Sequence, residues 1–246
     1  MERRLVYFVA DVHLGLPERD PAGREARFLD FLDGIPKDAR ALYLLGDIWD
    51  FWYEYRDVVP REGARVVARL INLVDAGVDV VFVPGNHDIW TYSFFESLGI
   101  RKVLQPVSEK IGDRTFCLGH GDGLGGSDLF YGLTLKMFRS RFIQRLFSTL
   151  HPWIAFRMAT AWSGDGRKRH SGYHFRGDES EPLYRFALGR TEDFCIFGHF
   201  HQEFDATLPG GRRMIILGDW ISGGRPYAVF DAATSSFSLH SGAARP

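Results

Sequence analysis

The sequence predicts an α/β fold in which helices cover a parallel sheet, and two observations lead to this prediction. In the first half of the chain, short apolar runs alternate with helix-like stretches in the order strand, helix, strand, helix, strand. This order is typical of parallel sheets, because each crossover between parallel strands requires a helix-sized connection. In the second half, a long helical stretch interrupts a series of strands. We therefore expect one domain over residues 1–246, with a helical cap inserted at about residues 128–175.

The elements of the first half follow from the spacing of their apolar residues. Each expected strand is a continuous apolar run that ends at glycine or a carboxylate, which is typical of a buried parallel strand. The helix before Gly77 has a clearly amphipathic pattern that stops at that glycine. The expected strands cover residues 4–11, 39–47 and 79–88, and the expected helices cover residues 22–35 and 62–77.

The second half is expected to contain hairpins around the helical insertion. Two short strands flank the turn at Gly112 and Asp113, and the helical stretch follows at residues 128–163. Glycine, proline and small residues at 209–211 and near 232–233 mark two further hairpin turns. The strands that return after the insertion are expected within residues 194–200, 203–220 and 225–242.

Composition limits the class of protein. A formal net charge of −1 gives no reason to expect nucleic-acid binding. Cys117 and Cys195 lie in apolar runs without CxxC spacing, so we expect buried free thiols and no disulfide or zinc–cysteine site. The apolar part of the N-terminus is too short for a signal peptide, and no run approaches the length of a membrane-spanning helix. We expect a cytoplasmic protein, and peripheral membrane contact stays open.

Five expected strand ends carry side chains that can bind metal ions. Taken singly, each of these motifs is more typical of a turn or a helix cap. However, five of the nine histidines lie at such ends, beside glycine, carboxylate or amide groups, and loops at the carboxyl ends of strands are where α/β sheets bind ligands. The candidate metal ligands are Asp11, His13, Asp47, Asn86, His120, His199 and His201.

The types of these side chains indicate the class of metal. Carboxylate, amide and imidazole groups without cysteine favour Mn²⁺, Fe²⁺ or Zn²⁺ over an all-oxygen calcium site. Seven candidates are too many for one tetrahedral ion, and they suit two divalent ions that share a bridging ligand. Two-metal sites are a common device for the hydrolysis of phosphoesters, because the ions stabilise phosphoryl oxygens and lower the pKa of a water.

The motifs DVH, GD, GNHD, HGD and GHFH, in this order over residues 8–201, resemble those of the calcineurin-like metallophosphoesterases. The resemblance implies a four-layer α-β-β-α sandwich with a helical cap inserted into it. It also implies one ion on Asp11, His13 and His201, a second ion on Asn86, His120 and His199, and Asp47 as the bridge. His87 matches the catalytic histidine of the family, which contacts the phosphate and assists the leaving oxygen, and Asp88 would orient His87.

The insertion is basic and apolar at the same time. Residues 136–176 hold nine basic residues and one acidic residue, and apolar residues recur there at three- and four-residue spacing. The ordinary interpretation is a helix that packs its apolar stripe on the domain and leaves its arginines in solvent. Because the segment follows a metal-site motif directly, it also suits a lipid that bears phosphates, or an anionic membrane surface.

The insertion resembles that of the lipid A branch of the family, the bacterial UDP-2,3-diacylglucosamine diphosphatases. The resemblance implies attack of water on the α-phosphorus of UDP-2,3-diacylglucosamine, which gives UMP and 2,3-diacylglucosamine 1-phosphate. It implies a peripheral location on the inner face of the bacterial inner membrane, and two Mn²⁺ ions, with Fe²⁺ or Zn²⁺ as alternatives. The implied substrate-binding residues are Asp128, Tyr131, Arg157, Arg167, Lys168 and Arg169.

One motif departs from this branch, because GNHD at residues 85–88 stands where the branch has GNRD. A lipid-linked nucleotide diphosphate is therefore one expected substrate, and another nucleotide or a phospholipid diester is the alternative. A non-catalytic scaffold of the same fold is a third hypothesis, which the complete set of ligand side chains disfavours.

Overall fold

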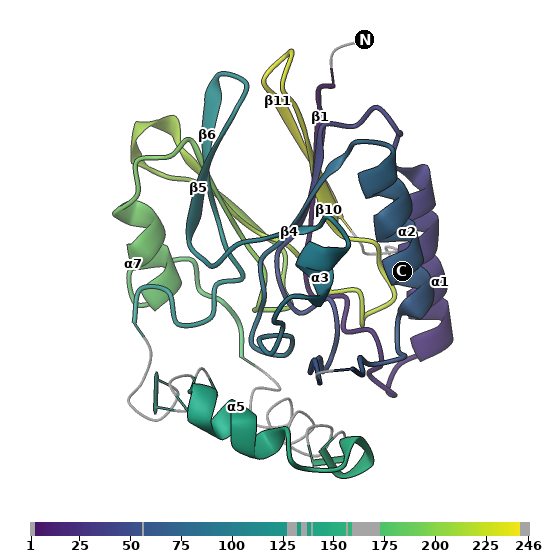
Figure 1. Ribbon diagram of the computed structural model, residues 1–246. Coiled ribbons are helices and arrows are strands. Elements are labelled where there is room, and N and C mark those ends of the chain that lie inside the picture. The colour runs from purple at the N-terminus through teal and green to yellow at the C-terminus, as the bar shows by residue number, and fades with distance from the viewer. Residues whose placement is uncertain are drawn as a thin grey trace.

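Two β-sheets pack face to face in the computed structural model, and helices cover the outer face of each sheet (Figure 1). The structure describes residues 3–55, 57–126, 132–133, 137–138, 140–155, 157–158 and 173–241. This four-layer arrangement confirms the expected α-β-β-α sandwich.

The first sheet has the strand order β11-β10-β1-β2-β3-β4. Strands β1 to β4 are parallel, whereas β10 pairs antiparallel with β1 and β11 completes a hairpin with β10. The chain thus returns at its end to the sheet that it began. The strands are β1 (Leu5–Val9), β2 (Ala41–Leu44), β3 (Asp79–Phe82), β4 (Arg101–Lys102), β10 (Tyr227–Asp231) and β11 (Ser236–His240).

The second sheet has the strand order β5-β6-β7-β9-β8. Its central strands β6, β7 and β9 are parallel, and the two edge strands pair antiparallel with their neighbours. The strands are β5 (Val107–Ile111), β6 (Arg114–Leu118), β7 (Phe194–Phe197), β8 (Phe204–Thr207) and β9 (Arg213–Ile216). A 3₁₀ turn, η1 (Pro209–Gly211), joins β8 to β9, where the sequence predicts a hairpin turn.

Helices α1 (Pro21–Gly34) and α2 (Ala64–Asp75) cover the first sheet, and α7 (Pro182–Leu188) covers the second. Alternate residues of β2 show how one strand serves two layers, because successive side chains point to opposite faces. Leu42 and Leu44 pack in the cluster that contains α1 and α2. Tyr43 lies in the cluster between the sheets. The core is therefore three apolar layers, which the periodicity of each strand specifies.

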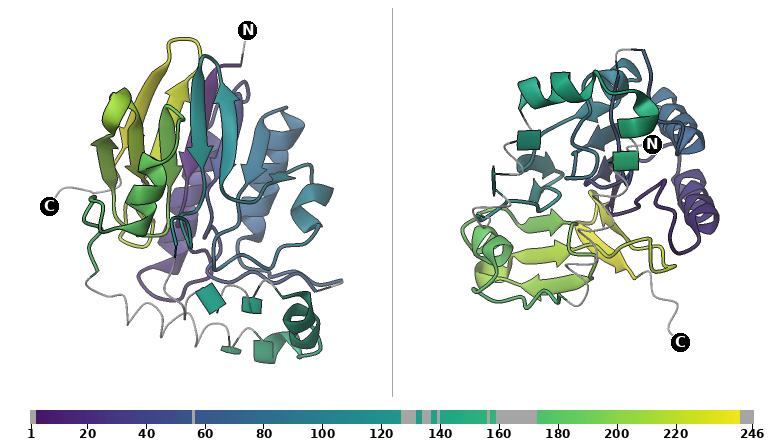
Figure 2. Two further views of the ribbon diagram at one scale, coloured as in Figure 1. Left: turned by 90° about the vertical axis from the view of Figure 1, so that its left-hand side faces the viewer. Right: turned by 90° about the horizontal axis from the view of Figure 1, so that it is seen from below.

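The insertion contains the helix α5 (Arg141–Phe147), which lies across one end of the sandwich in two perpendicular views (Figures 1 and 2). A helix in this region is as the sequence predicts, but much of residues 128–163 lies outside the described residues. The extent of the cap therefore stays a prediction. The short helix α3 (Phe94–Ser97), the strand β4 and the helix α7 are elements that the apolar pattern did not indicate.

Candidate metal centre

The candidate metal ligands follow the carboxyl ends of five strands and converge at one edge of the two sheets. Asp11 and His13 follow β1, Asp47 follows β2, and Asn86 follows β3. The second sheet contributes His120 after β6 and the pair His199 and His201 after β7. Side chains from both sheets thus meet in common groups. The strand ends that carry them lie on the side of the sandwich that faces α5 (Figure 1).

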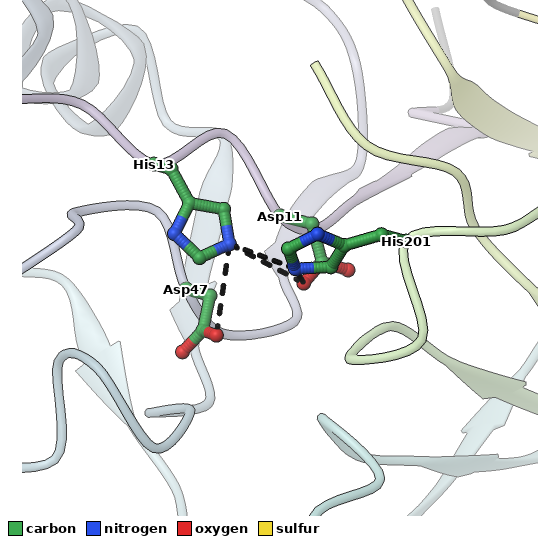
Figure 3. Close-up of side chains that lie close together, drawn as sticks. All are labelled: Asp11, His13, Asp47 and His201. Atoms are coloured by element: carbon green, nitrogen blue, oxygen red, sulfur yellow. Dashed lines mark hydrogen bonds and ion pairs between the residues drawn. The ribbon is translucent and has the colours of Figure 1, made fainter. Parts of the chain in front are cut away.

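The first group consists of Asp11, His13, Asp47 and His201, whose candidate ligand atoms lie within 4.8 Å of one another (Figure 3). His13 Nε2 lies 3.0 Å from His201 Nε2 and 3.8 Å from an oxygen of each carboxylate. His201 Nε2 lies 3.4 Å from Asp11 Oδ1. Two imidazoles and two carboxylates therefore present their lone-pair atoms to one small volume.

The second group consists of Asp47, His120 and His199. His120 Nε2 lies 3.3 Å from Asp47 Oδ2, from Asn86 Oδ1 and from His199 Nδ1. The other ring nitrogen of His120 is 3.0 Å from the carbonyl oxygen of Leu45, a contact that sets the orientation of the ring. Asp47 belongs to both groups, as expected for a ligand that bridges two ions.

A divalent cation fits this set of donors. Asp11 Oδ1 is buried and has no hydrogen-bond partner among the described residues. A buried carboxylate oxygen without a partner is costly unless a cation satisfies it. Oxygen and imidazole nitrogen ligands together suit Mn²⁺, Fe²⁺ and Zn²⁺. The donor set therefore agrees with a divalent metal centre.

The electrostatics of the centre are those of a buried cluster of opposite charges. Burial alone would raise the pKa of Asp47, but the imidazoles of His120 and His87 hold it well below its usual range. For His13 the effect of burial has the opposite sign and lowers the pKa. The carboxylates of Asp11 and Asp50 outweigh this effect and raise the pKa of His13 to about 10. Asp11 has a raised pKa because it is buried. Burial and the neighbouring charge of His13 lower the pKa of His201 well below its usual range, so positive charge is stabilised on His13 but not on His201.

Five of the seven candidate ligands have left-handed backbone conformations. Their φ angles lie between 52° and 74°, a region that residues other than glycine adopt uncommonly, although asparagine, aspartate and histidine enter it more often than the rest. Each such residue costs about 1–3 kcal/mol, and such strain gathers at functional sites. The residues are Asp11, His13, Asp47, His199 and His201.

Two glycines permit the close packing of the turns. A Cβ atom on Gly46 would lie 2.5 Å from His120 Nδ1, and Gly46 itself has a φ of 84°. A Cβ atom on Gly198 would collide with the carboxylate of Asp11. The glycines of the GD and GHFH motifs therefore leave the space in which the ligands approach one another.

Asp50 is a residue of the centre that the sequence analysis did not single out. Its Oδ1 lies 3.1 Å from His13 Nδ1, on the side of the ring opposite to the nitrogen that faces the other ligands. A carboxylate in this position fixes the tautomer and the orientation of a ligand histidine. The available signal was the position of Asp50 three residues after Asp47, within the GDIWD stretch that leaves β2.

His87 lies at the edge of the centre. Its Nδ1 is 2.8 Å from the carbonyl oxygen of Asp50, and its Nε2 is 3.9 Å from Asp47 Oδ2. The side chain is 18% exposed, whereas those of His13 and His120 are fully buried. His87, in the turn after β3, is therefore a histidine that a substrate can reach beside the buried ligands.

Asp88 forms its hydrogen bonds with the backbone of two turns, and its expected role in orienting His87 stays a prediction. Its carboxylate accepts hydrogen bonds from the backbone amides of Gly85 at 2.7 Å and Ile48 at 2.8 Å. It thereby joins the turn after β3 to the turn after β2. Burial and the nearby charge of Asp47 raise the pKa of Asp88 to about 7.

The expected substrate residues lie mostly outside the described residues. This holds for Asp128, Tyr131, Arg167, Lys168 and Arg169. Arg157 is described, is exposed, and stacks over the ring of Trp153 with its guanidinium carbon 4.8 Å from the ring centroid. Trp153 itself is 62% exposed.

The apolar stripe of the insertion does not pack as one surface on the domain. Phe138 is half-buried and contacts Trp90. Phe142 and Leu146 belong to the same three- and four-residue spacing but are 74% and 59% exposed. Periodicity identified the helix and could not tell which of its faces meets the protein.

A two-sheet sandwich that gathers aspartate, asparagine and histidine at its strand ends, with one carboxylate shared by two groups, defines a metal-dependent phosphoesterase. The described residues contain no helix with the length and apolarity that a membrane crossing requires. The family model of the calcineurin-like phosphoesterases matches residues 5–203, and the chain belongs to this family.

Two bacterial hydrolases agree with this assignment. The UDP-2,3-diacylglucosamine hydrolase of Porphyromonas gingivalis is 34% identical over 94% of this chain and 96% of its own length. The enzyme of the same name from Proteus mirabilis is 37% identical over 90% of this chain and 93% of its own length. A solved dimetal phosphatase from Danio rerio is 15% identical, with a TM-score of 0.49 over 94% of this chain and 93% of its own. The chain is thus a metal-dependent hydrolase of phosphoesters or phosphoanhydrides.

Proposed function

We propose that this protein hydrolyses the diphosphate of UDP-2,3-diacylglucosamine to UMP and 2,3-diacylglucosamine 1-phosphate. The proposal depends on one observation. The sequence is similar, over nearly the whole chain including the insertion, to two hydrolases that are named for that substrate. An exposed apolar and basic cap beside a phosphoesterase centre also suits a substrate with acyl chains and two phosphates.

Two divalent ions would occupy the centre, and Mn²⁺ is the proposed metal. Asp11, His13 and His201 would hold one ion, Asn86, His120 and His199 the other, and Asp47 both. Support for this division comes from the two groups of ligand atoms that share Asp47. When bound, such ions neutralise charge on phosphoryl oxygens and lower the pKa of a water molecule, so that hydroxide is available at neutral pH.

The protein's own groups would position the substrate and assist the leaving group. His87 is the proposed catalytic histidine, because its partly exposed ring stands beside Asp47 and Asp50 holds its Nδ1 side. Its Nε2 edge would contact the phosphate and stabilise the oxygen of the departing sugar phosphate. Asp88 would support this step indirectly, by fixing the turn on which His87 lies.

The cap over about residues 128–175 is the proposed site for the rest of the substrate. Asp128, Tyr131 and the basic residues Arg157, Arg167, Lys168 and Arg169 are proposed to lie near the sugar and phosphates. Exposed side chains such as Trp153 and Leu146, next to arginines, suit contact with an anionic membrane surface. We propose a cytoplasmic protein that binds peripherally to the inner face of the inner membrane.

The test is hydrolysis by purified protein with Mn²⁺ in water enriched in ¹⁸O. UDP-2,3-diacylglucosamine should release UMP far faster than unacylated UDP-GlcNAc does, and the label should appear in UMP, because water attacks the α-phosphorus. Label in the sugar phosphate would refute attack at that phosphorus. Equal rates with and without acyl chains would refute the lipid substrate and favour a general nucleotide phosphodiesterase. The Asp47→Ala variant is the control for a contaminating hydrolase.

A further inference from the structure

A cluster of aromatic side chains joins the cap to the loops that follow β2 and β3. Phe147, the last residue of α5, has its ring centroid 4.5 Å from that of Trp90, 5.0 Å from that of Tyr53 and 6.3 Å from that of Phe51. Phe138 lies 5.5 Å from Trp90 in an edge-to-face arrangement. We call these five residues the aromatic anchor.

Hydrogen bonds fix the same contact. Trp90 Nε1 donates to the backbone carbonyl oxygen of Phe138 at 2.7 Å. The hydroxyl of Tyr53 donates to the backbone carbonyl oxygen of Gln144, also at 2.7 Å. The side-chain amide of Gln144 also donates to the carbonyl oxygen of Phe138, at 2.8 Å. Tyr53 and Trp90 are buried, so these bonds form away from competing water. Rings and hydrogen bonds together define one position for α5.

The loops that hold the anchor are the loops that hold the centre. Phe51 follows Asp50 directly, and Asp50 contacts His13. The backbone amide of Trp52 donates to the carbonyl oxygen of His87 at 3.3 Å, and Tyr53 forms a parallel bridge with Trp90. A helix attached to Tyr53 and Trp90 therefore has a fixed position relative to His87.

The two faces of α5 differ in what they meet. Phe147 is half-buried in the anchor, whereas Phe142, on the same helix, is 74% exposed. Loss of the Phe147 ring removes contacts to three aromatic partners. Loss of the Phe142 ring removes none of them, which makes Phe142 a matched comparison.

We infer that Phe147 is a positioning residue that acts through Trp90 and Tyr53 to hold α5 at the distance from the metal centre that the acylated substrate requires. This inference rests on the proposed function for the identity of that substrate. The anchor would thereby contribute to selection of a lipid-linked diphosphate over small diesters, because a small diester needs the centre and not the cap.

The experiment compares Phe147→Ala and Phe147→Tyr on two substrates, UDP-2,3-diacylglucosamine in detergent micelles and bis(4-nitrophenyl) phosphate. Phe147→Ala should lower kcat/KM for the acylated substrate by about tenfold and leave that for the small diester within about twofold. Phe147→Tyr should restore most of the loss, because the ring remains. An equal loss on both substrates, or no loss on the acylated one, would overturn the inference.

Hydrogen exchange measures the anchor without any substrate. Amides of residues 141–148 should exchange faster in Phe147→Ala than in the unchanged protein, and at the unchanged rate in Phe142→Ala. Equal protection in all three proteins would show that the anchor does not hold α5. If the unchanged protein cleaves the small diester and not the acylated substrate, the proposed function fails and the lipid role of Phe147 fails with it, whereas the exchange result still decides whether Phe147 holds the cap.

Discussion

Replacement of Asp50 by asparagine removes a negative charge from the centre without removing any of the seven ligands predicted from the sequence. Asp50 Oδ1 is 3.1 Å from His13 Nδ1 and 3.6 Å from His87 Nδ1. Loss of a carboxylate that orients a ligand histidine typically costs 10–100-fold in metal affinity. We therefore expect Asp50→Asn to weaken Mn²⁺ binding by about 10–100-fold, equivalent to about 1.4–2.8 kcal/mol.

The assay is calorimetric titration of metal-stripped protein with Mn²⁺, followed by activity at saturating Mn²⁺. Asp33→Asn is the matched control, because Asp33 is an exposed carboxylate on α1 that pairs with Arg69, 2.8 Å away. The control should keep the affinity of the unchanged protein. An unchanged Mn²⁺ dissociation constant in Asp50→Asn, or an equal loss in Asp33→Asn, would refute the role given to Asp50.

Three further predictions concern the centre and the framework around it. Asp47→Ala should abolish turnover and reduce bound metal from two ions to one or none, because Asp47 belongs to both groups. Elemental analysis measures the bound metal, and two ions in this variant would contradict the role of Asp47 as a ligand shared by both ions. Glu54→Ala should lower the free energy of unfolding in urea by about 2–3 kcal/mol, since Glu54 Oε2 accepts the amides of Tyr92 at 2.7 Å and Ser93 at 2.8 Å; a midpoint within error of the unchanged protein would refute this. Burial opposes ionisation of Glu192, but Arg190 and a serine hydroxyl lower its pKa from 4.5 to about 2. The contribution of the ionised Glu192 to the free energy of unfolding is therefore complete above about pH 4.5 and is lost as the pH falls toward 2. Glu192→Gln should therefore be less stable near pH 7 by about 1–3 kcal/mol and should lose less stability on acidification, as followed by thermal melts from pH 7 to 3.

The sequence predicts the half of the fold in which neighbouring strands are also consecutive in the chain. Apolar runs and amphipathic helices specify β1 to β3 with α1 and α2, since each unit packs on the next one. The second sheet is harder, because β6 and β7 pair across the whole insertion and β10 returns to β1. Residue patterns alone predicted a parallel sheet for the first half and assigned the later strands to no sheet, and the two-sheet sandwich came from the family resemblance.

The site was predictable as a list of residues and not as a geometry. Strand ends with histidine and aspartate are visible in the sequence, but the left-handed conformations of Asp11 and His13 depend on hydrogen bonds to the turn after β2. The contacts of Asp50 and Asp88 likewise join residues of different turns. The faces of α5 depend on Trp90 and Tyr53, and helical periodicity contains no information about these partners.

The metal centre joins distant parts of the chain, and this has a consequence for biosynthesis. His13 and His201, whose ring nitrogens are 3.0 Å apart, are separated by 188 positions in the sequence. A chain growing from its N-terminus cannot complete the group of Asp11, His13, Asp47 and His201 until the turn after β7 has been made and the second sheet has packed on the first. Binding of a divalent ion by this group would therefore report that both sheets have assembled.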